Sequence, residues 1–142
     1  MPSPDAPLTG RCACGAVRFE VTAPFETAGY CHCERCQHRS GGLWSTNAFV
    51  RPDGFRITQG AEKVRTWIPE GGSPKSFCED CGGHVFGGRD EGPYRVVRFG
   101  ALDGDPGIEP QWHAWLESAP DWAPVPEDGL ERFERGASFR RP

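Results

Sequence analysis

The sequence predicts a mainly β domain made of small antiparallel sheets, with little helix. It holds 19 glycines and 14 prolines, which are 33 of the 142 residues and about twice the usual share. The longest stretch free of both is Tyr30–Ser40, only 11 residues long, about the length of one average helix. Short segments that favour extended structure recur at roughly ten-residue spacing, as in antiparallel β domains. We therefore expect neither a helical bundle nor a doubly wound α/β domain.

The first four expected strands are short segments with the composition of strands. In Ala16–Val21 apolar side chains alternate with charged ones, which predicts a half-buried strand. Tyr30–Cys33 is a shorter candidate, and Trp44–Val50 is rich in aromatic and β-branched residues. The turn signal Pro52-Asp53-Gly54 then precedes Phe55–Thr58, where apolar and polar residues alternate again.

Four more strands are expected in the next part of the chain. Lys63–Ile68 shows the same alternation, and Tyr94–Phe99 is the last strong strand. Between them, Ser76–Cys78 and His84–Phe86 flank a turn that contains glycine.

The segment Ala101–Gly129 differs from the rest of the chain. Its five prolines prevent regular structure over much of its length, yet it holds three tryptophans. We expect it to pack irregularly across the sheets, with one helical turn near Trp115–Ser118. A single domain is expected over residues 10–136, between a flexible N-terminal tail at 1–9 and a C-terminal tail at 137–142.

Composition and charge exclude several classes of protein. A hydrophobic fraction of 37%, with five tryptophans and nine phenylalanines, is incompatible with a disordered chain. The net charge of −4 provides no broad positive field for nucleic acid or an anionic membrane. The N-terminus lacks the basic start and apolar run of a signal peptide, and no segment approaches about 20 apolar residues. We expect a cytoplasmic protein with no nucleic-acid or membrane partner.

The cysteines are the strongest chemical signal. There are seven, in three groups: Cys12 and Cys14; Cys31, Cys33 and Cys36; and Cys78 and Cys81. In a reducing compartment, clustered thiols favour metal binding over disulfides. An odd number also fits poorly with a framework made only of disulfides.

The outer two pairs have the pattern of a closed zinc site. Cys14 and Cys81 are each followed at once by glycine, which permits the sharp turn that a metal-binding knuckle needs. Two such knuckles provide the four thiolates of a tetrahedral structural zinc. We therefore predict that Cys12, Cys14, Cys78 and Cys81 bind one zinc ion.

The middle group predicts a different kind of site. If Cys31 and Cys33 lie on one strand, they point to one face and His32 to the other, so His32 is a poor ligand candidate. Three thiolates without an evident fourth ligand indicate an open, catalytic zinc site. Two other interpretations stay open: a redox-active thiol group, or a second structural zinc completed by one of three histidines, His38, His84 or His113.

Basic residues near the cysteines are candidates for substrate binding. Arg35, Arg39 and Lys75 lie nearest to the cysteines in sequence and could hold an anionic substrate, although each also fits a surface charge.

These motifs resemble the glutathione-dependent formaldehyde-activating enzyme family, also called the GFA or centromere-protein-V-like family. The similarity comprises Gly10-x-Cys12-x-Cys14-Gly15-x-Val17-x-Phe19, Cys31-His32-Cys33-x-x-Cys36 with Ser40-Gly41, Ser73-x-Lys75-x-Phe77-Cys78-x-x-Cys81-Gly82 with Phe86, and the aromatic-rich Pro110–Phe133. Lys75 and Gly83 stand where the family often has arginine and a hydroxyl residue.

The resemblance implies a β-tent fold built from small antiparallel sheets. It implies two zinc ions per chain: a structural ion on Cys12, Cys14, Cys78 and Cys81, and a catalytic ion on Cys31, Cys33 and Cys36. It also implies carbon–sulfur lyase or synthase activity on a thiol–aldehyde adduct such as S-hydroxymethylglutathione, with glutathione-like thiols and aldehydes as partners. The alternatives are a two-zinc module that binds a protein and a thiol redox protein.

Overall fold

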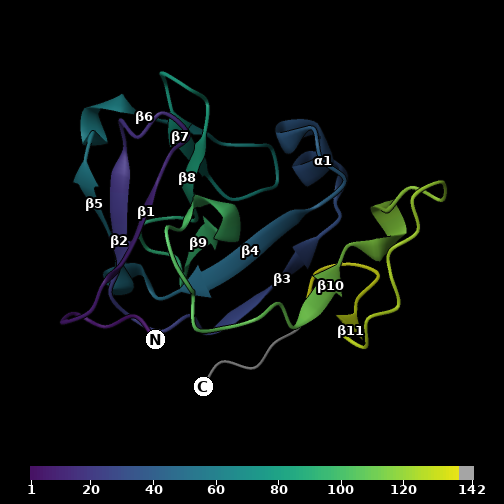
Figure 1. Cartoon of the computed structure of the whole chain (residues 1–142). Helices are drawn as coiled ribbons and strands as arrows, with labels where there is room; N and C mark the ends of the chain where they lie inside the picture. The colour runs from purple at the N-terminus through teal and green to yellow at the C-terminus, as the bar shows by residue number, and fades with distance from the viewer. Residues whose placement is uncertain (138–142) are drawn as a thin grey trace.

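Two β-sheets organise the chain in a computed structural model, which describes residues 1–137 (Figure 1). The smaller sheet has the strand order β1-β2-β5, and the larger has the order β11-β10-β3-β4-β9-β8-β7-β6. The strands are β1 (Leu8–Arg11), β2 (Arg18–Val21), β3 (Thr27–Cys31), β4 (Ser45–Val50), β5 (Phe55–Gln59), β6 (Val64–Trp67), β7 (Lys75–Cys78), β8 (His84–Gly87), β9 (Arg95–Arg98), β10 (Trp112–Ala114) and β11 (Glu131–Arg132). The helical elements are α1 (Glu34–Ser40) and the 3-10 turns η1 (Pro52–Gly54), η2 (Ala61–Lys63), η3 (Phe99–Ala101) and η4 (Leu116–Ser118).

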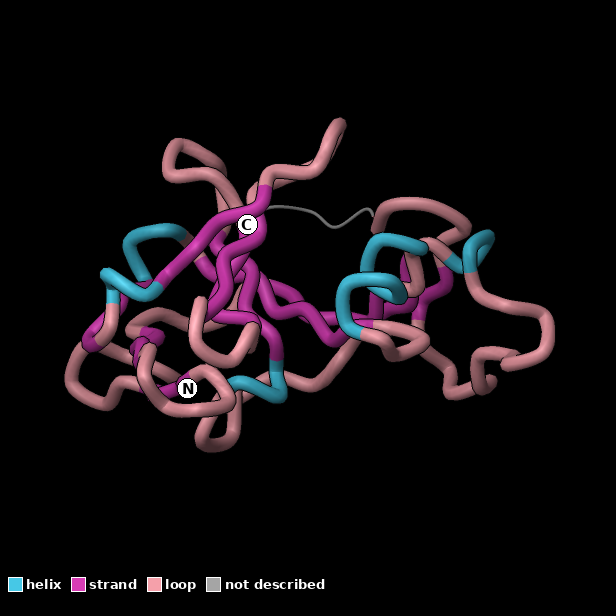
Figure 2. The backbone as a smooth tube through the Cα atoms, turned by 90° about the horizontal axis from the view of Figure 1, so that it is seen from above, coloured by secondary structure: helices cyan, strands magenta, loops and turns pink. Residues whose placement is uncertain are grey.

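The core forms where the two sheets meet. Phe19 is fully buried, and its ring lies 5.1 Å from that of Phe55, which in turn lies 5.1 Å from that of Phe86 on β8 (centroid distances). Valines from β2, β4, β8 and β9 complete this apolar cluster: Val21, Val50, Val85 and Val97. The alternation of these strands therefore places their apolar faces in one shared core, and Figure 2 shows strands passing through the middle of the molecule.

The prediction of a mainly β chain with little helix is confirmed. All eight expected strands occur, with ends shifted by up to three residues, and most pairs are antiparallel. Strand β1 begins at Leu8, so the predicted N-terminal tail at 1–9 extends two residues too far. Of the predicted C-terminal tail at 137–142, residues 138–142 lie outside the described part of the chain.

The proline-rich segment is more regular than the sequence indicates. Its residues Trp112–Ala114 form β10, which pairs in parallel with both β3 and β11, whereas only antiparallel pairing was expected. Trp112 fixes the strand. Its indole N–H donates to Thr27 Oγ1 (2.8 Å), and its ring covers Gly29. A Cβ atom at Gly29 would lie 2.1 Å from Cδ2 of this ring, so only glycine fits there. The expected helical turn near Trp115–Ser118 is present as η4.

The described residues contain no helix that could cross a bilayer.

Candidate metal centres and the pocket beside them

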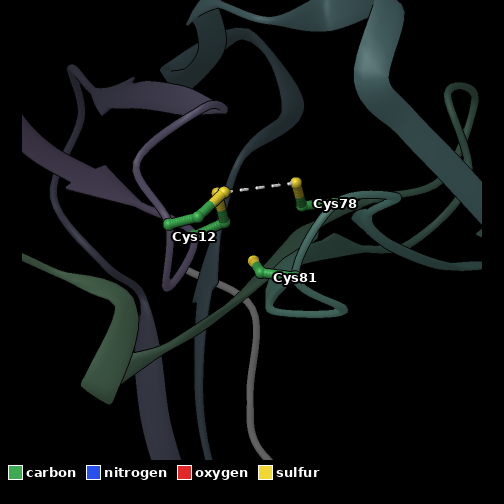
Figure 3. Close-up of side chains that lie close together, drawn as sticks. Cys12, Cys78 and Cys81 are labelled. Atoms are coloured by element: carbon green, nitrogen blue, oxygen red, sulfur yellow. Dashed lines mark hydrogen bonds between the residues drawn. The ribbon is translucent and has the colours of Figure 1, made fainter.

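Four sulfur atoms converge between β1 and the β7–β8 turn. The Sγ atoms of Cys12, Cys14, Cys78 and Cys81 all lie within 4.8 Å of one another, and Figure 3 shows three of these side chains turned towards a common point. Cys12 Sγ lies 3.7 Å from Cys14 Sγ, which lies 3.9 Å from Cys78 Sγ. A tetrahedron with Zn–S bonds of about 2.3 Å has edges of about 3.8 Å. The sulfur positions therefore fit a tetrahedral zinc ion.

The backbone around these sulfurs has the predicted knuckle geometry. Gly15 and Gly82 adopt positive φ angles of 78° and 73°, so both turns use the freedom of glycine. The Val17 N–H donates to Cys12 Sγ (3.3 Å), and the Gly83 N–H donates to Cys81 Sγ (3.3 Å). Backbone hydrogen bonds from Cys14 and Gly83 lower the pKa of Cys81 to about 6. The turns thus stabilise thiolates, the form that binds a metal.

Three further sulfur atoms converge at the end of β3. The Sγ atoms of Cys31, Cys33 and Cys36 lie within 4.8 Å of one another, and no histidine, aspartate or glutamate of residues 1–137 joins them. The expectation that Cys31 and Cys33 lie on one strand is wrong. Strand β3 ends at Cys31, and the chain turns into α1, whose N-cap is Cys33.

Helix α1 is what brings the third cysteine to this group. The Cys36 N–H donates to Cys33 Sγ (3.3 Å), which caps the helix, and Gly41 ends it with φ 74° and a hydrogen bond to Gln37 O. Cys36 therefore lies one helical turn after Cys33, on the same side as Cys31. The seven-residue helix uses the longest stretch of the chain without glycine or proline.

The predicted histidine ligands lie elsewhere. His32 is buried, and its Nε2 shares a hydrogen bond with His113 Nδ1 (2.9 Å), while His113 Nε2 contacts Asp128 Oδ2 (2.9 Å). His84 Nδ1 accepts from Arg39 and Arg98, and His38 is exposed. The structure thus brings none of His38, His84 and His113 to the three sulfurs.

Charge at the three-cysteine group is concentrated on Cys36. Hydrogen bonds from Cys31 and Cys33, then Ser45, and the positive charge of Arg98 hold the pKa of Cys36 far below its ordinary value. Hydrogen bonds with Cys33 and Cys36, followed by burial and the negative charge of Cys36, raise the pKa of Cys31. When one of three close thiols is ionised, its negative charge opposes deprotonation of the other two. A bound cation offsets this repulsion, so the three sulfur atoms fit a soft divalent metal ion.

Cys33 lines a surface hollow, which gives the three-cysteine group an open side. The hollow has a volume of about 250 Å³ and is bounded by Glu34, Arg35, Trp115 and Ser118. Trp115 has a φ of 59°, and among residues 1–137 no other non-glycine residue has a positive φ. Such strain persists only where the surroundings enforce it, and here Trp115 lines the same hollow as Cys33.

A second, smaller pocket carries several positive charges. Its volume is about 150 Å³, and its polar lining consists of Arg39, Asn47, Ser73, Lys75, His84 and Arg98. Two of the three basic residues singled out in the sequence, Arg39 and Lys75, therefore meet here. Arg35 instead lines the hollow beside Cys33, where it donates to Glu70 O (3.2 Å).

Sequence reasoning did not identify the residues that link this pocket to Cys36. Arg98 Nη1 donates to Ser45 Oγ (3.1 Å), and Ser45 Oγ donates to Cys36 Sγ (3.1 Å). Ser45 and Asn47 lie two residues apart on β4, so both side chains point to the same face of the sheet. This pair of polar residues is the one signal in the sequence that this face of β4 is polar.

The chain is similar to known proteins over most of its length. The glutathione-dependent formaldehyde-activating enzyme family matches residues 7–118, which include all seven cysteines. The chain belongs to this family. A Halomonas elongata protein that carries the family's name is 30% identical over 138 residues, 91% of this chain and 87% of that protein. The crystal structure of a Rhodobacter sphaeroides protein superposes with a TM-score of 0.57 at 25% identity, over 88% of this chain and 98% of that one.

Membership of this glutathione-dependent formaldehyde-activating enzyme family agrees with the fold and with the positions of the cysteines. The mainly β fold that the resemblance implies is present, and the three cysteine groups gather into two clusters of sulfur atoms.

Proposed function

We propose that this family member is a zinc-dependent carbon–sulfur lyase or synthase that acts on a thiol–aldehyde adduct. The observation that supports this most is the three-sulfur group of Cys31, Cys33 and Cys36, which has no fourth protein ligand among residues 1–137 and opens to a hollow at Cys33. Open coordination of this kind distinguishes catalytic from structural zinc sites. The family name supports a glutathione-like thiol and formaldehyde as the partners.

In this proposal two zinc ions have separate roles. Cys12, Cys14, Cys78 and Cys81 hold a structural ion in a closed four-sulfur site, and the three-cysteine group holds the catalytic one. When bound there, zinc supplies a Lewis acid that lowers the pKa of a substrate thiol.

The chain's own residues orient the reactants and balance charge. The Ser45 hydroxyl donates to Cys36 Sγ, and the Arg98 guanidinium donates to Ser45, so these two residues stabilise the negative charge of the thiolates. Trp115 and Ser118 bound the hollow in which a substrate would approach Cys33. In the condensation a carbon–sulfur bond forms, and the thiol proton ends on the former carbonyl oxygen. The lyase reaction is the reverse.

The expected result is that the zinc-loaded protein accelerates exchange between free formaldehyde and its glutathione adduct. Exchange spectroscopy by NMR measures this rate at equilibrium and separates it from the spontaneous reaction. S-methylglutathione is the matched control, because it cannot form the adduct.

Two other functions would give different results. A thiol redox protein would contain at most the one zinc ion of the four-cysteine site, whereas the proposal requires two per chain. A zinc module that only binds a protein would hold both ions and leave the exchange at its spontaneous rate, which would contradict the proposal.

A further inference from the structure

Three cations converge in the pocket of about 150 Å³, and no acidic residue lines it. Arg39 comes from α1, Lys75 from β7 and Arg98 from β9. Within residues 1–137, none of the three forms an ion pair with aspartate or glutamate. The pocket is therefore a concentration of positive charge without a carboxylate partner.

Burial makes this arrangement costly when the pocket holds no anion. Nη2 of Arg39 is buried and has no hydrogen-bond partner among the described residues. Burial, followed by the charge of Arg98, lowers the pKa of Arg39 to about 10 and also lowers the pKa of Lys75. Repulsion between partly desolvated like charges is relieved by an anion placed among them.

The negative charge of the three thiolates balances only part of the positive charge of the pocket. Zinc on three thiolates carries a net charge of about −1, and Arg98 already faces Cys36 through Ser45. Arg39 and Lys75 remain as an excess of two positive charges on the pocket wall. Neutral formaldehyde does not require them.

The position and size of the pocket indicate what an anion there would be. Arg98 is linked to Cys36 through Ser45 by two hydrogen bonds, each 3.1 Å long, so the pocket lies on the side of the three-cysteine group that carries Cys36. A pocket of about 150 Å³ accommodates a carboxylate with two or three further carbon atoms.

We propose that the pocket formed by Arg39, Lys75 and Arg98 binds a carboxylate of the substrate adduct, on the side of the three-cysteine group that carries Cys36. This inference rests on the proposed function of the neighbouring three-cysteine group. The carboxylate belongs either to the carbonyl compound, as in a 2-oxo acid such as glyoxylate, or to the thiol. Guanidinium and ammonium groups bind carboxylates in both cases through charge-assisted hydrogen bonds.

The test compares probes that differ only in the carboxylate. On the thiol side, 3-mercaptopropionate is compared with 2-mercaptoethanol by isothermal titration calorimetry. On the carbonyl side, glyoxylate is compared with glycolaldehyde in the exchange assay, with 2-mercaptoethanol as the thiol. In one of the two pairs the carboxylate is expected to improve binding or turnover at least tenfold. That pair shows whether the carboxylate belongs to the thiol or to the carbonyl compound.

The variant that tests the site is Lys75→Met, which removes one charge and keeps the side-chain length. The carboxylate preference is expected to fall to threefold or less. Lys63→Met is the matched control, because Lys63 pairs with Asp80 and lines neither the pocket nor the hollow beside Cys33. It is expected to keep the full preference.

A third arm needs neither a thiol nor turnover, so it separates failure of this site from failure of the proposed function. Propionate is expected to raise the thermal midpoint of the wild type and of Lys63→Met, but not of Lys75→Met, with 1-propanol as the uncharged reference. Without an anion, Lys75→Met is expected to be at least as stable as the wild type. The proposal is overturned if none of the three arms shows a carboxylate effect that depends on Lys75.

Discussion

Replacing Cys12 with serine is expected to leave the chain unfolded or insoluble. Cys12 and Cys78 are 2% and 0% exposed, so their site is part of the core. The site also joins the end of β1 to the β7–β8 turn across the 63 residues between Cys14 and Cys78. A structural zinc contributes about 10–16 kcal/mol, as much as the roughly 5–15 kcal/mol of stability of a whole domain.

Circular dichroism and metal analysis of the purified Cys12→Ser variant measure this effect. The sheet signal and both metal ions are expected to be lost together. A soluble variant with the wild-type spectrum and one remaining zinc would contradict a folding role for the four-cysteine site.

Replacing Cys33 with serine is expected to have the opposite pattern: a folded chain without activity. Cys33 is half-buried at the edge of a hollow, and its main structural contact is the N-cap hydrogen bond from the Cys36 N–H. Serine is itself a preferred N-cap residue, so α1 is retained. Loss of one of three zinc ligands is expected to reduce adduct exchange by about a thousandfold or more.

Cys12→Ser and Cys33→Ser are matched controls for each other, since each changes one sulfur to oxygen. The Cys33→Ser chain is expected to retain one zinc ion and a thermal midpoint within a few degrees of the wild type. If it unfolds as badly as Cys12→Ser, the three-cysteine group is structural, and the enzyme proposal loses its main support.

The positions of the strands could be predicted because apolar and polar residues alternate along a strand that has one buried face. Phe19 and Val21 are buried where the pattern of Ala16–Val21 places them. Helix α1 was missed because its N-cap is a cysteine, which is not a usual capping signal. Strand β10 was missed because prolines surround it, and its parallel pairing depends on the contact of Trp112 with distant Gly29.

The cysteine groups could be predicted for a similar reason, since local spacing determines which sulfurs meet. The glycines after Cys14 and Cys81 have the positive φ angles that the knuckle prediction requires. The residues around the three-cysteine group could not be found this way. Ser45 comes from β4 and Arg98 from β9, and the order of strands in the large sheet decides that they meet.

The central claim, an open coordination position on the three-cysteine group, is tested most directly by cobalt substitution. Ligand-field bands of cobalt report the number of thiolate ligands and the geometry, and cobalt in the four-cysteine site serves as an internal reference. Addition of glutathione is expected to shift the spectrum of the second cobalt from three-sulfur to four-sulfur character, while S-methylglutathione is expected to leave it unchanged. An unchanged spectrum at saturating glutathione would mean that the protein itself fills the fourth position, which would contradict the open catalytic site.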